Sequence, residues 1–238
     1  MDYLKRANEI ADQLVAYRRH QHMHPELGMD MERAVAYVSD ALRAIGCEPK
    51  RVGRCGVVTT IGKPGGKVFL LRADMDALPI QEDSGLEFAS QVPNKAHCCG
   101  HDLHTAMLLG AAQLLKEHES ELDGMVKLMF QPGEETMEGA RDMLEAGVLE
   151  NPHVDAAMEI HVNSVTKSGR LFVFRGAVCA SSDLFTIRVQ GKGGHGSRPE
   201  LTIDPINAAC HIHLALQELQ AREVMAGEVG VLTIGSSL

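Results

Sequence analysis

Hydrophobic positions over the first 45 residues recur with the spacing of amphipathic helices. Apolar side chains repeat at near-helical intervals over residues 1–20, and the same pattern returns over residues 31–45 before Gly46 ends it. A connection interrupted by proline and glycine lies between the two segments and carries His22 and His24. We therefore predict two opening helices, with these histidines as surface or packing residues.

From residue 57 the pattern changes to short apolar runs that end in polar residues: VVTTIG, VFLLRADMD, VKLMFQPGEE and AAMEIHVN. Runs of this length are typical of buried strands, and a helical pattern over residues 102–117 separates the second run from the third. The alternation of strands with a helix predicts an α/β fold with a largely parallel central sheet.

The pattern changes again in the last quarter of the chain. SDLFTIRVQ has the period of a strand, and GEVGVLTIG has the composition of another. Between them, after a glycine-rich loop, Asp204 and Pro205 supply an N-cap and a first turn for a helix. We therefore predict a catalytic domain over residues 1–180 and a smaller, incomplete α+β domain over residues 181–238.

Composition is that of an ordinary globular protein. The 238 residues are 45% hydrophobic and 23% charged. The net charge of -9 argues against a nucleic-acid partner, because phosphate binding requires a basic surface. The N-terminus mixes charges of both signs, and no segment approaches the ~18 uninterrupted apolar residues of a membrane span. We expect a cytoplasmic protein with neither a membrane nor a nucleic-acid partner.

Six cysteines are scattered through a chain that has enough core-forming residues to fold without disulfides. We therefore expect reduced thiols. Four of them are interpreted as small hydrophobic residues in or near the core: Cys47, Cys55, Cys179 and Cys210.

Side chains capable of chemistry gather where three predicted strands end: Asp74, Asp76, Glu134, Glu135 and His161. The carboxyl ends of the strands form the edge of an α/β sheet at which ligands bind. A single carboxylate at such a position is commonly a helix cap or part of a solvated turn. Three sets at one edge favour a ligand site, because burying them together is costly unless they pair or hold a metal ion.

The segment AHCCGHDLH adds two cysteines and three histidines just before the predicted helix. A redox pair is disfavoured because adjacent Cα atoms lie ~3.8 Å apart, whereas a disulfide needs ~4.4–6.8 Å. A closed structural zinc site is disfavoured because no second Cys or His pair follows at the usual spacing. An open, catalytic divalent-metal site remains. Neighbouring Glu134 and Glu135 then suggest that one carboxylate binds metal while the other is the general base of a hydrolysis.

Six segments, in order, resemble the motifs of the amidohydrolase branch of the metallopeptidases: RRHQHMHPELG, RADMDALP, HCCGHD, QPGEE, EIHV and GKGGHGSRPE. That branch includes aminoacylases, hippurate hydrolases, N-acetyl-diaminopimelate deacetylases and auxin-conjugate hydrolases. The resemblance runs from about residue 18 to the end of the chain. It implies a metallopeptidase-type catalytic domain, a smaller lid or dimerisation domain, a homodimer, and a site for two divalent ions of zinc, manganese, cobalt or nickel.

The resemblance also implies a role for each matched side chain. Four positions match metal ligands, the first of them bridging: Cys99, His101, Glu135 and His161. Glu134 matches the general base, and Asp76 matches a carboxylate that orients the site, a role that Asp74 would share. His195 matches the histidine of the smaller domain that stabilises the oxyanion of the reaction.

Three neighbours of these residues receive lesser roles. Cys98 stands where the family often has a small residue. Asp102 is interpreted either as the cap of the following helix or as a site residue. His104 is interpreted as a residue that packs against the site or orients it, rather than as a ligand.

The chain departs from the family pattern in one respect. In the family, the catalytic domain resumes after the smaller one and supplies a last ligand histidine, whereas no histidine follows His213 here. We therefore expect a chain truncated at its C-terminus. The predicted function is a metal-dependent amidohydrolase that cleaves N-acyl amino acids. One alternative is a dipeptidase or carboxypeptidase-like exopeptidase acting on short peptides, and another is a metal-binding or dimerising remnant without activity.

Overall fold

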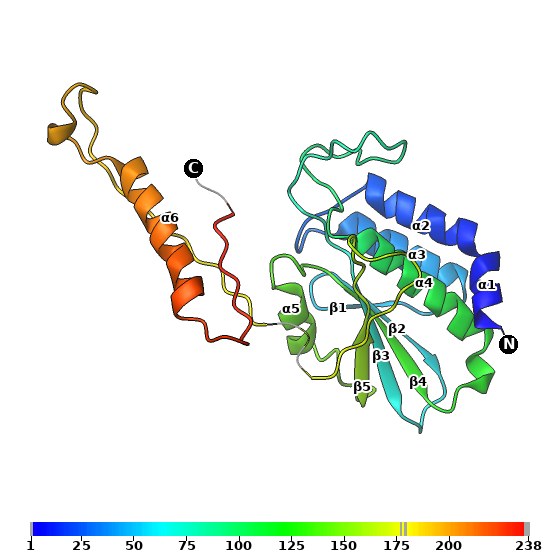
Figure 1. Cartoon of the computed structure of the whole chain (residues 1–238). Coiled ribbons are helices and arrows are strands. Elements are labelled where there is room, and N and C mark those ends of the chain that lie inside the picture. The colour runs from blue at the N-terminus through cyan, green and yellow to red at the C-terminus, as the bar shows by residue number, and fades with distance from the viewer. Residues whose placement is uncertain (1, 177, 179, 236–238) are drawn as a thin grey trace. The chain divides into compact units, whose positions relative to one another are not determined.

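The computed structural model describes residues 2–176, 178 and 180–235 (Figure 1). The chain separates into two compact units, unit 1 (Met1–Lys167) and unit 2 (Ser168–Leu238). This division comes earlier than the predicted one between residues 180 and 181, and none of the described residues from Ser168 onward is buried. Each unit is described by itself.

Unit 1 is a five-stranded sheet with helices packed on it (Figure 1). Its helices are α1 (Tyr3–Glu9), α2 (Ala11–Met23), α3 (Glu32–Ala44), α4 (His101–Glu117) and α5 (Gly139–Glu145), with a short 3-10 helix, η1 (Glu119–Glu121). Its strands are β1 (Lys50–Val52), β2 (Gly56–Gly62), β3 (Val68–Asp74), β4 (Met125–Gln131) and β5 (Ala156–Glu159). The four strands predicted for this part of the chain are therefore confirmed. The first predicted helix is present as two segments, α1 and α2.

The strand order is β1-β2-β4-β3-β5. Strand β2 is antiparallel to both of its neighbours, whereas β3 is parallel to β4 and to β5. Only β2 therefore runs against the other strands, which confirms the largely parallel sheet. Because β3, β4 and β5 are parallel, their carboxyl ends meet at one edge of the sheet. There Asp74 of β3 lies opposite Gln131 of β4.

The two faces of the sheet pack on different helices. Residues of α3 and α4 form the larger core with one set of strand side chains: Val57, Ile61, Ala73, Leu128 and Phe130. Alternate strand residues pack on the other face with Met143 of α5 and with Val148: Val58, Leu70 and Met129. Full burial of one such side chain stabilises a fold by ~1.5–3 kcal/mol. The sheet is thus held between helices, and its carboxyl edge is a rigid base for a site.

Unit 2 contains η2 (Pro199–Leu201) and α6 (Pro205–Arg222) with extended chain on both sides. The Asp204 carboxylate accepts the N–H groups of Ile206 and Asn207, so this helix begins where the sequence predicts it. The two strands predicted in this unit form no ladder within the described residues, where Lys192 and Ile203 make an isolated bridge. Period-two patterning favours a strand only when a neighbouring strand supplies hydrogen bonds.

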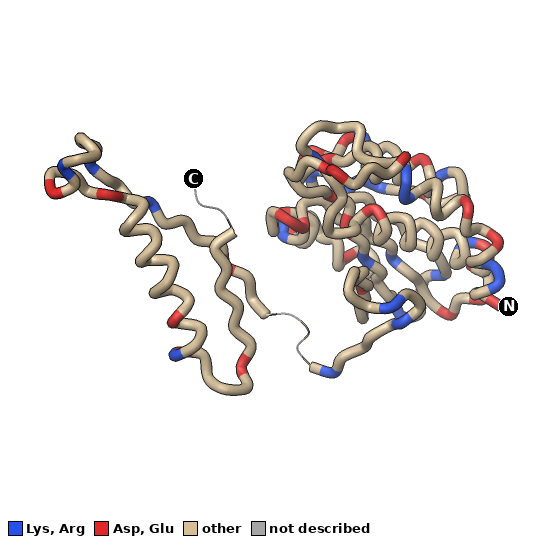
Figure 2. Tube along the Cα trace, turned by 45° about the horizontal axis from the view of Figure 1, so that its top comes forward, with Lys and Arg blue, Asp and Glu red and all other residues tan. Residues whose placement is uncertain are grey.

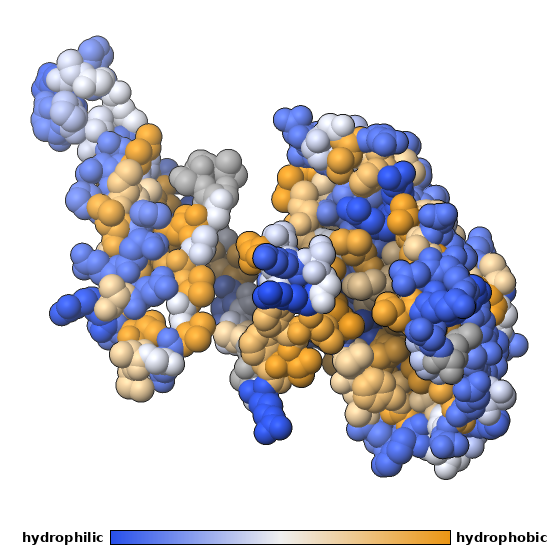
Figure 3. All heavy atoms as spheres, turned by 45° about the vertical axis from the view of Figure 1, so that its right-hand side comes forward, coloured by the Kyte–Doolittle hydropathy of each residue, from blue (hydrophilic) through white to orange (hydrophobic). Residues whose placement is uncertain are grey.

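Apolar side chains of unit 2 are in solvent. None of its described residues is buried, and Leu184, Val229 and Val231 are 96%, 84% and 82% exposed. Figure 3 shows hydrophobic side chains of this unit, in orange, among hydrophilic ones. Charges of both signs are spread over unit 1, whereas most of α6 carries neither (Figure 2). Exposed apolar surface of this extent is typical of an interaction surface.

Two further expectations concern cysteines and membranes. Cys47 and Cys55 are buried as expected, whereas Cys210 is exposed, and Cys179 lies outside the described residues. Among the described residues, none of the helices combines the length and the apolar character that a bilayer crossing requires.

Candidate metal centre

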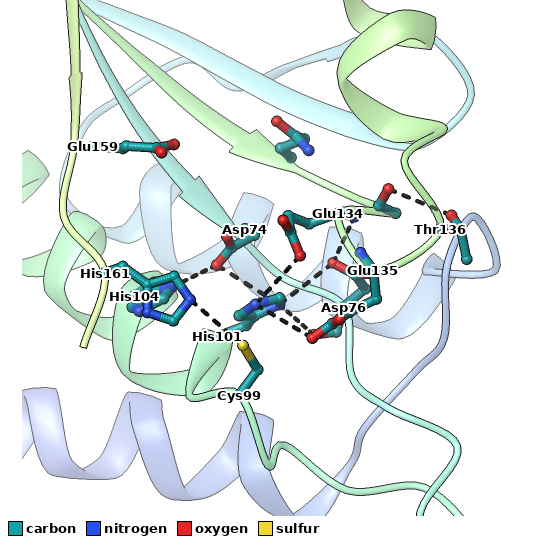
Figure 4. Close-up of polar contacts among 12 residues, drawn as sticks. Asp74, Asp76, Cys99, His101, His104, Glu134, Glu135, Thr136, Glu159 and His161 are labelled. Atoms are coloured by element: carbon teal, nitrogen blue, oxygen red, sulfur yellow. Dashed lines mark hydrogen bonds and ion pairs between the residues drawn. The ribbon is translucent and has the colours of Figure 1, made fainter. Parts of the chain in front are cut away.

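Side chains from three strand ends and from the start of α4 meet at the carboxyl edge of the sheet in unit 1 (Figure 4). The residues that contact one another there are Asp74, Asp76, Cys99, His101, His104, Glu134, Glu135 and His161. The structure therefore brings together all of the site residues that the sequence predicts in this unit.

Three groups of ligand-type atoms share His101, and one of them joins it with Asp74 and His104. One ligand atom each of Cys99, His101 and His161 lies within 4.8 Å of the others, and the same holds for His101, Glu134 and Glu135. Within the group that contains Cys99, the Sγ atom of this residue is 3.4 Å from His161 Nε2. Thiol, imidazole and carboxylate together form the donor set of zinc and similar divalent ions.

Two buried atoms at the middle of this cluster have no hydrogen-bond partner among the described residues. They are His101 Nε2 and Glu135 Oε1, and they are 3.8 Å apart. The His101 Nδ1–H group donates to the Asp76 carbonyl oxygen at 2.8 Å, which leaves the lone pair on Nε2. An unsatisfied buried polar atom costs ~1–3 kcal/mol, and a cation bound between these two atoms would satisfy both. The residues present therefore fit a divalent metal ion.

The Asp76 carboxylate holds both glutamates in place. Its Oδ1 atom accepts the N–H of Glu134 at 3.0 Å, and its Oδ2 atom accepts the N–H of Glu135 at 3.1 Å. Asp76 itself is fully buried. The two successive side chains differ in access to solvent, since Glu134 is 41% exposed and Glu135 is 23% exposed. This contact is of the kind expected for an orienting carboxylate.

Crowded negative charge shifts pKa values in the cluster. Burial and the Glu135 carboxylate raise the pKa of Glu134, and the same two causes raise the pKa of Cys99 to about 12. Burial alone would lower the pKa of His101, but its hydrogen bond to Asp76 and the nearby carboxylates raise it. A bound cation would counter this charge and displace protons from the thiol and the imidazole.

His104 and Asp74 lie beside the cluster with their polar atoms engaged. His104 Nδ1 is 2.6 Å from Asp74 Oδ1, and His104 Nε2 accepts the N–H of Val162 at 2.9 Å. The second Asp74 oxygen is 3.0 Å from Arg72 Nη1. Burial would raise the pKa of Asp74, but the hydrogen bond from His104 and the neighbouring positive charges lower it. A ligand atom of each residue lies within 4.8 Å of one of His101. The polar atoms of both side chains already contact His104, Asp74, Val162 or Arg72.

Asp102 does not cap α4, which corrects one of its two interpretations. The cap position is Gly100, whose left-handed φ of +96° suits glycine. The Asp102 carboxylate instead accepts Arg18 Nε–H at 3.0 Å and lies 2.9 Å from His22 Nδ1. The other nitrogen of His22 faces Glu82 at 3.2 Å, and the hydrogen bond to Asp102 raises the pKa of His22.

The position of His22 corrects a second expectation, because it is buried in the last turn of α2 rather than in the connection after it. Its partner Asp102 is 80 residues away along the chain. Nothing in the local sequence therefore indicated this partner.

His195 lies in the exposed glycine-rich loop of unit 2. Its Nδ1 atom accepts the backbone N–H of Ser197 at 3.2 Å, and the Ser197 Oγ atom is 2.8 Å from the same nitrogen. Because a backbone N–H can only donate, the lone pair is on Nδ1 and the ring proton of the neutral form is on Nε2. The Nε2–H group is thus available as a donor, and the oxyanion role of His195 stays a prediction.

The segment that carries this cluster matches a known protein family. The model of peptidase family M20/M25/M40 matches residues 70–225, which is more than half of the chain. The chain belongs to this family. Its match includes the ends of β3, β4 and β5 as well as α4 and α6.

Two curated relatives are similar over nearly the whole chain. IAA-amino acid hydrolase ILR1-like 5 of Arabidopsis thaliana is 43% identical over 234 residues, 98% of this chain and 53% of the relative. The N-acyl-L-amino acid amidohydrolase of Geobacillus stearothermophilus is 39% identical over 230 residues, 95% of this chain and 62% of the relative. The M20-family chain thus spans little more than half the length of these proteins.

Solved structures agree with the fold. The YXEP protein of Bacillus subtilis, a dinuclear metal binding peptidase from the M20 family, is 41% identical and superposes with a TM-score of 0.63. The match covers 66% of this chain and 44% of that one. Together with the relatives, it confirms the resemblance to the amidohydrolase branch that the six sequence motifs indicated.

Proposed function

We propose that this M20-family chain carries the metal centre of an amidohydrolase that cleaves the amide bond of N-acyl amino acids. The observation that carries the proposal is the pair of buried, partnerless ligand atoms on His101 and Glu135. The Glu134 carboxylate lies 3.9 Å from the same His101 nitrogen, within reach of a reacting water. The names of the two relatives, an N-acyl amino acid amidohydrolase and an IAA-amino acid hydrolase, support the substrate class.

The proposed cofactor is a pair of divalent ions, either zinc, manganese, cobalt or nickel. Four side chains would hold them: Cys99, His101, Glu135 and His161. The mixture of donors and the dinuclear centre of the Bacillus subtilis protein support this number. Bound ions supply Lewis-acid chemistry, since they polarise the amide carbonyl and lower the pKa of water to ~7.

Glu134 is the proposed general base. It takes a proton from the water that attacks the acyl carbon, and it returns that proton to the nitrogen of the leaving amino acid. A carboxylate with a raised pKa accepts protons more readily than an ordinary one, and burial beside Glu135 gives Glu134 this property. Asp76 keeps Glu134 in position through its backbone N–H. His195 would donate its Nε2–H to the developing oxyanion.

The test is the substitution Glu134→Gln in the full chain loaded with each ion in turn. Turnover of acetyl- and benzoyl-amino acids should fall by at least ~10²-fold, because the base is lost. Metal content, measured by mass spectrometry, should stay at the wild-type value. Glu138→Gln is the matched control, since this exposed glutamate lies four residues further and outside the cluster. Turnover that survives Glu134→Gln would contradict the assignment.

The same assay separates the alternatives. An exopeptidase, which the peptidase name of the Bacillus subtilis structure favours, would hydrolyse dipeptides faster than N-acyl amino acids. A chain that binds metal and hydrolyses neither class would support the non-catalytic alternative. These outcomes differ in substrate preference, so one panel of substrates distinguishes them.

We also propose that unit 2 is a lid and dimerisation domain, as predicted for residues 181–238, and that the protein is a cytoplasmic homodimer. The exposed apolar side chains of this unit support the dimer. The free thiols of the described cysteines suit a reducing compartment. Light scattering at micromolar concentration should give twice the chain mass, and a monomer there would contradict the dimer.

A further inference from the structure

The hydrogen bonds of His104 fix its tautomer. Its Nε2 atom is 2.9 Å from the backbone nitrogen of Val162, which can only donate, so the lone pair is on Nε2. The ring proton is then on Nδ1, which is 2.6 Å from an oxygen of Asp74. His104 is therefore a neutral imidazole that donates on one side and accepts on the other.

Asp74 is a firm anchor for this imidazole. Its second oxygen lies 3.0 Å from Arg72 Nη1, and the same Arg72 nitrogen is 2.6 Å from Glu159. Its backbone carbonyl accepts the hydroxyl of Thr105 at 2.9 Å. His104 and Asp74 are only 3% and 1% exposed. One end of the His104 ring is thus tied to the interior of unit 1.

The other end of the ring contacts the chain just after a short edge strand. Strand β5 has four residues, all exposed, and stands at one edge of the sheet with β3 as its neighbour. His161 follows this strand and is itself exposed, so packing does little to fix it. The Val162 amide that His104 accepts is the next one along the chain. The rings of His104 and His161 also meet edge to face, with centroids 4.5 Å apart (Figure 4).

We propose that His104 is a positioning residue that holds His161 against Cys99 through the Val162 amide, with Asp74 as its anchor. In this arrangement Asp74 and His104 are not metal ligands, although a ligand atom of each lies near His101. The effect on metal binding rests on the proposed function. The tautomer and the Val162 contact do not, because they need no ion.

The first experiment measures the tautomer in the metal-free, full-length chain. Nitrogen NMR of the protein labelled at histidine should show His104 with a protonated Nδ1 and an unprotonated Nε2, assigned by the signals that His104→Gln removes. Hydrogen exchange should show a protected Val162 amide that becomes unprotected in His104→Asn. An imidazolium, an Nε2–H tautomer or an unprotected Val162 amide in the wild type would overturn the proposal.

The second experiment separates the two ends of the ring by zinc titration. Asparagine can still donate toward Asp74 but cannot reach Val162, whereas glutamine can present an oxygen near the Nε2 position. His104→Asn should weaken zinc binding ~10-fold or more, the usual effect of losing a group that orients a ligand, and His104→Gln should weaken it less. Equal zinc affinity in all three proteins, or equal loss in both variants, would overturn the proposal.

Two controls complete the design. His118→Asn, at the far end of α4, should leave zinc affinity unchanged, because His118 contacts Glu121 and Tyr3 rather than the site. Circular dichroism should confirm that every variant is folded before titration. If the wild-type chain binds no zinc, the proposed function fails, and the exchange of the Val162 amide still decides the role of His104.

Discussion

Units 1 and 2 differ in how far they bury their side chains. Unit 1 buries polar groups as well as apolar ones, and the buried carboxylates of Asp74, Asp76 and Asp102 each have a partner from a distant part of the chain. Unit 2 buries none of its described residues, leucines and valines included. Helix α6 nevertheless forms, because its Asp204 cap and its first-turn proline are local signals. Local signals therefore suffice for a helix, whereas a cluster of buried polar side chains requires a packed core.

The largest expected difference between the two units is the loss of unfolding free energy when a leucine is replaced by alanine. Leu128→Ala, in the middle of the core of unit 1, should lower the free energy of unfolding by ~2–5 kcal/mol. Leu214 of α6 is 62% exposed, so Leu214→Ala should change the free energy of unfolding by less than ~0.5 kcal/mol. Urea denaturation followed by circular dichroism measures both. Similar losses for the two variants would mean that the contrast between the units is not one of packing.

Replacing a buried lysine of unit 1 tests how much its buried polar groups contribute to stability. Lys127 is 2% exposed, and its Nζ atom donates to the carbonyl oxygens of Val148, Glu150 and Pro152 at 2.7, 2.9 and 2.8 Å. Lys127→Met should cost ~2–4 kcal/mol because three acceptors lose their donor. The exposed Lys50→Met on β1 is the control and should be nearly neutral. Equal unfolding midpoints for the two variants would show that the carbonyl oxygens find other donors.

The charged network behind α4 predicts a pH dependence of unit 1. The raised pKa of His22 means that its contribution is complete below 6.5, its unfolded value, and is lost as the pH rises through the folded value. The lowered pKa of Asp102 means that its contribution is complete above 3.8 and is lost as the pH falls through its folded value. Unfolding midpoints measured from pH 4 to 9 should therefore decline on the alkaline side. His22→Gln should reduce that decline to the part contributed by His101, whose pKa is also raised, and the exposed His153→Gln should leave it unchanged.

The smallest effect belongs to unit 2. Ser197→Ala removes the hydroxyl beside His195 but keeps the backbone N–H, so one of two contacts to Nδ1 remains. The preference for the Nε2–H tautomer should fall by about fivefold, equivalent to ~1 kcal/mol for one hydrogen bond. Nitrogen NMR measures the ratio, and the free energy of unfolding should not change. A ratio that stays at the wild-type value would assign the preference to the backbone alone.

Much of unit 1 could be predicted because its signals are local. An apolar run followed by an acidic residue marks the end of a buried strand, and three such ends defined the edge where the site lies. Strand β1 was missed since three residues carry too little pattern to recognise. The cap of α4 was misjudged because Gly100 adopts a left-handed φ that only the folded loop requires.

The contacts that position the site could not be predicted. His104 and Val162 are 58 residues apart, and His22 and Asp102 are 80 apart. Their pairing depends on how α4 lies against α2 and against the segment that follows β5, which no local pattern encodes. The strands expected in unit 2 show the converse limit. SDLFTIRVQ has the right alternation, but alternation cannot supply the neighbouring strand with which to pair.

The Asp76 carboxylate couples the positions of two neighbouring residues. Its two oxygens hold successive amides, so the backbone positions of Glu134 and Glu135 are coupled to each other. Any change that tilts this one carboxylate would shift the proposed base and the proposed ligand together. Variants that improve one of the two at the expense of the other should therefore be rare in this turn, and adaptation to a new substrate would have to arise elsewhere in the protein.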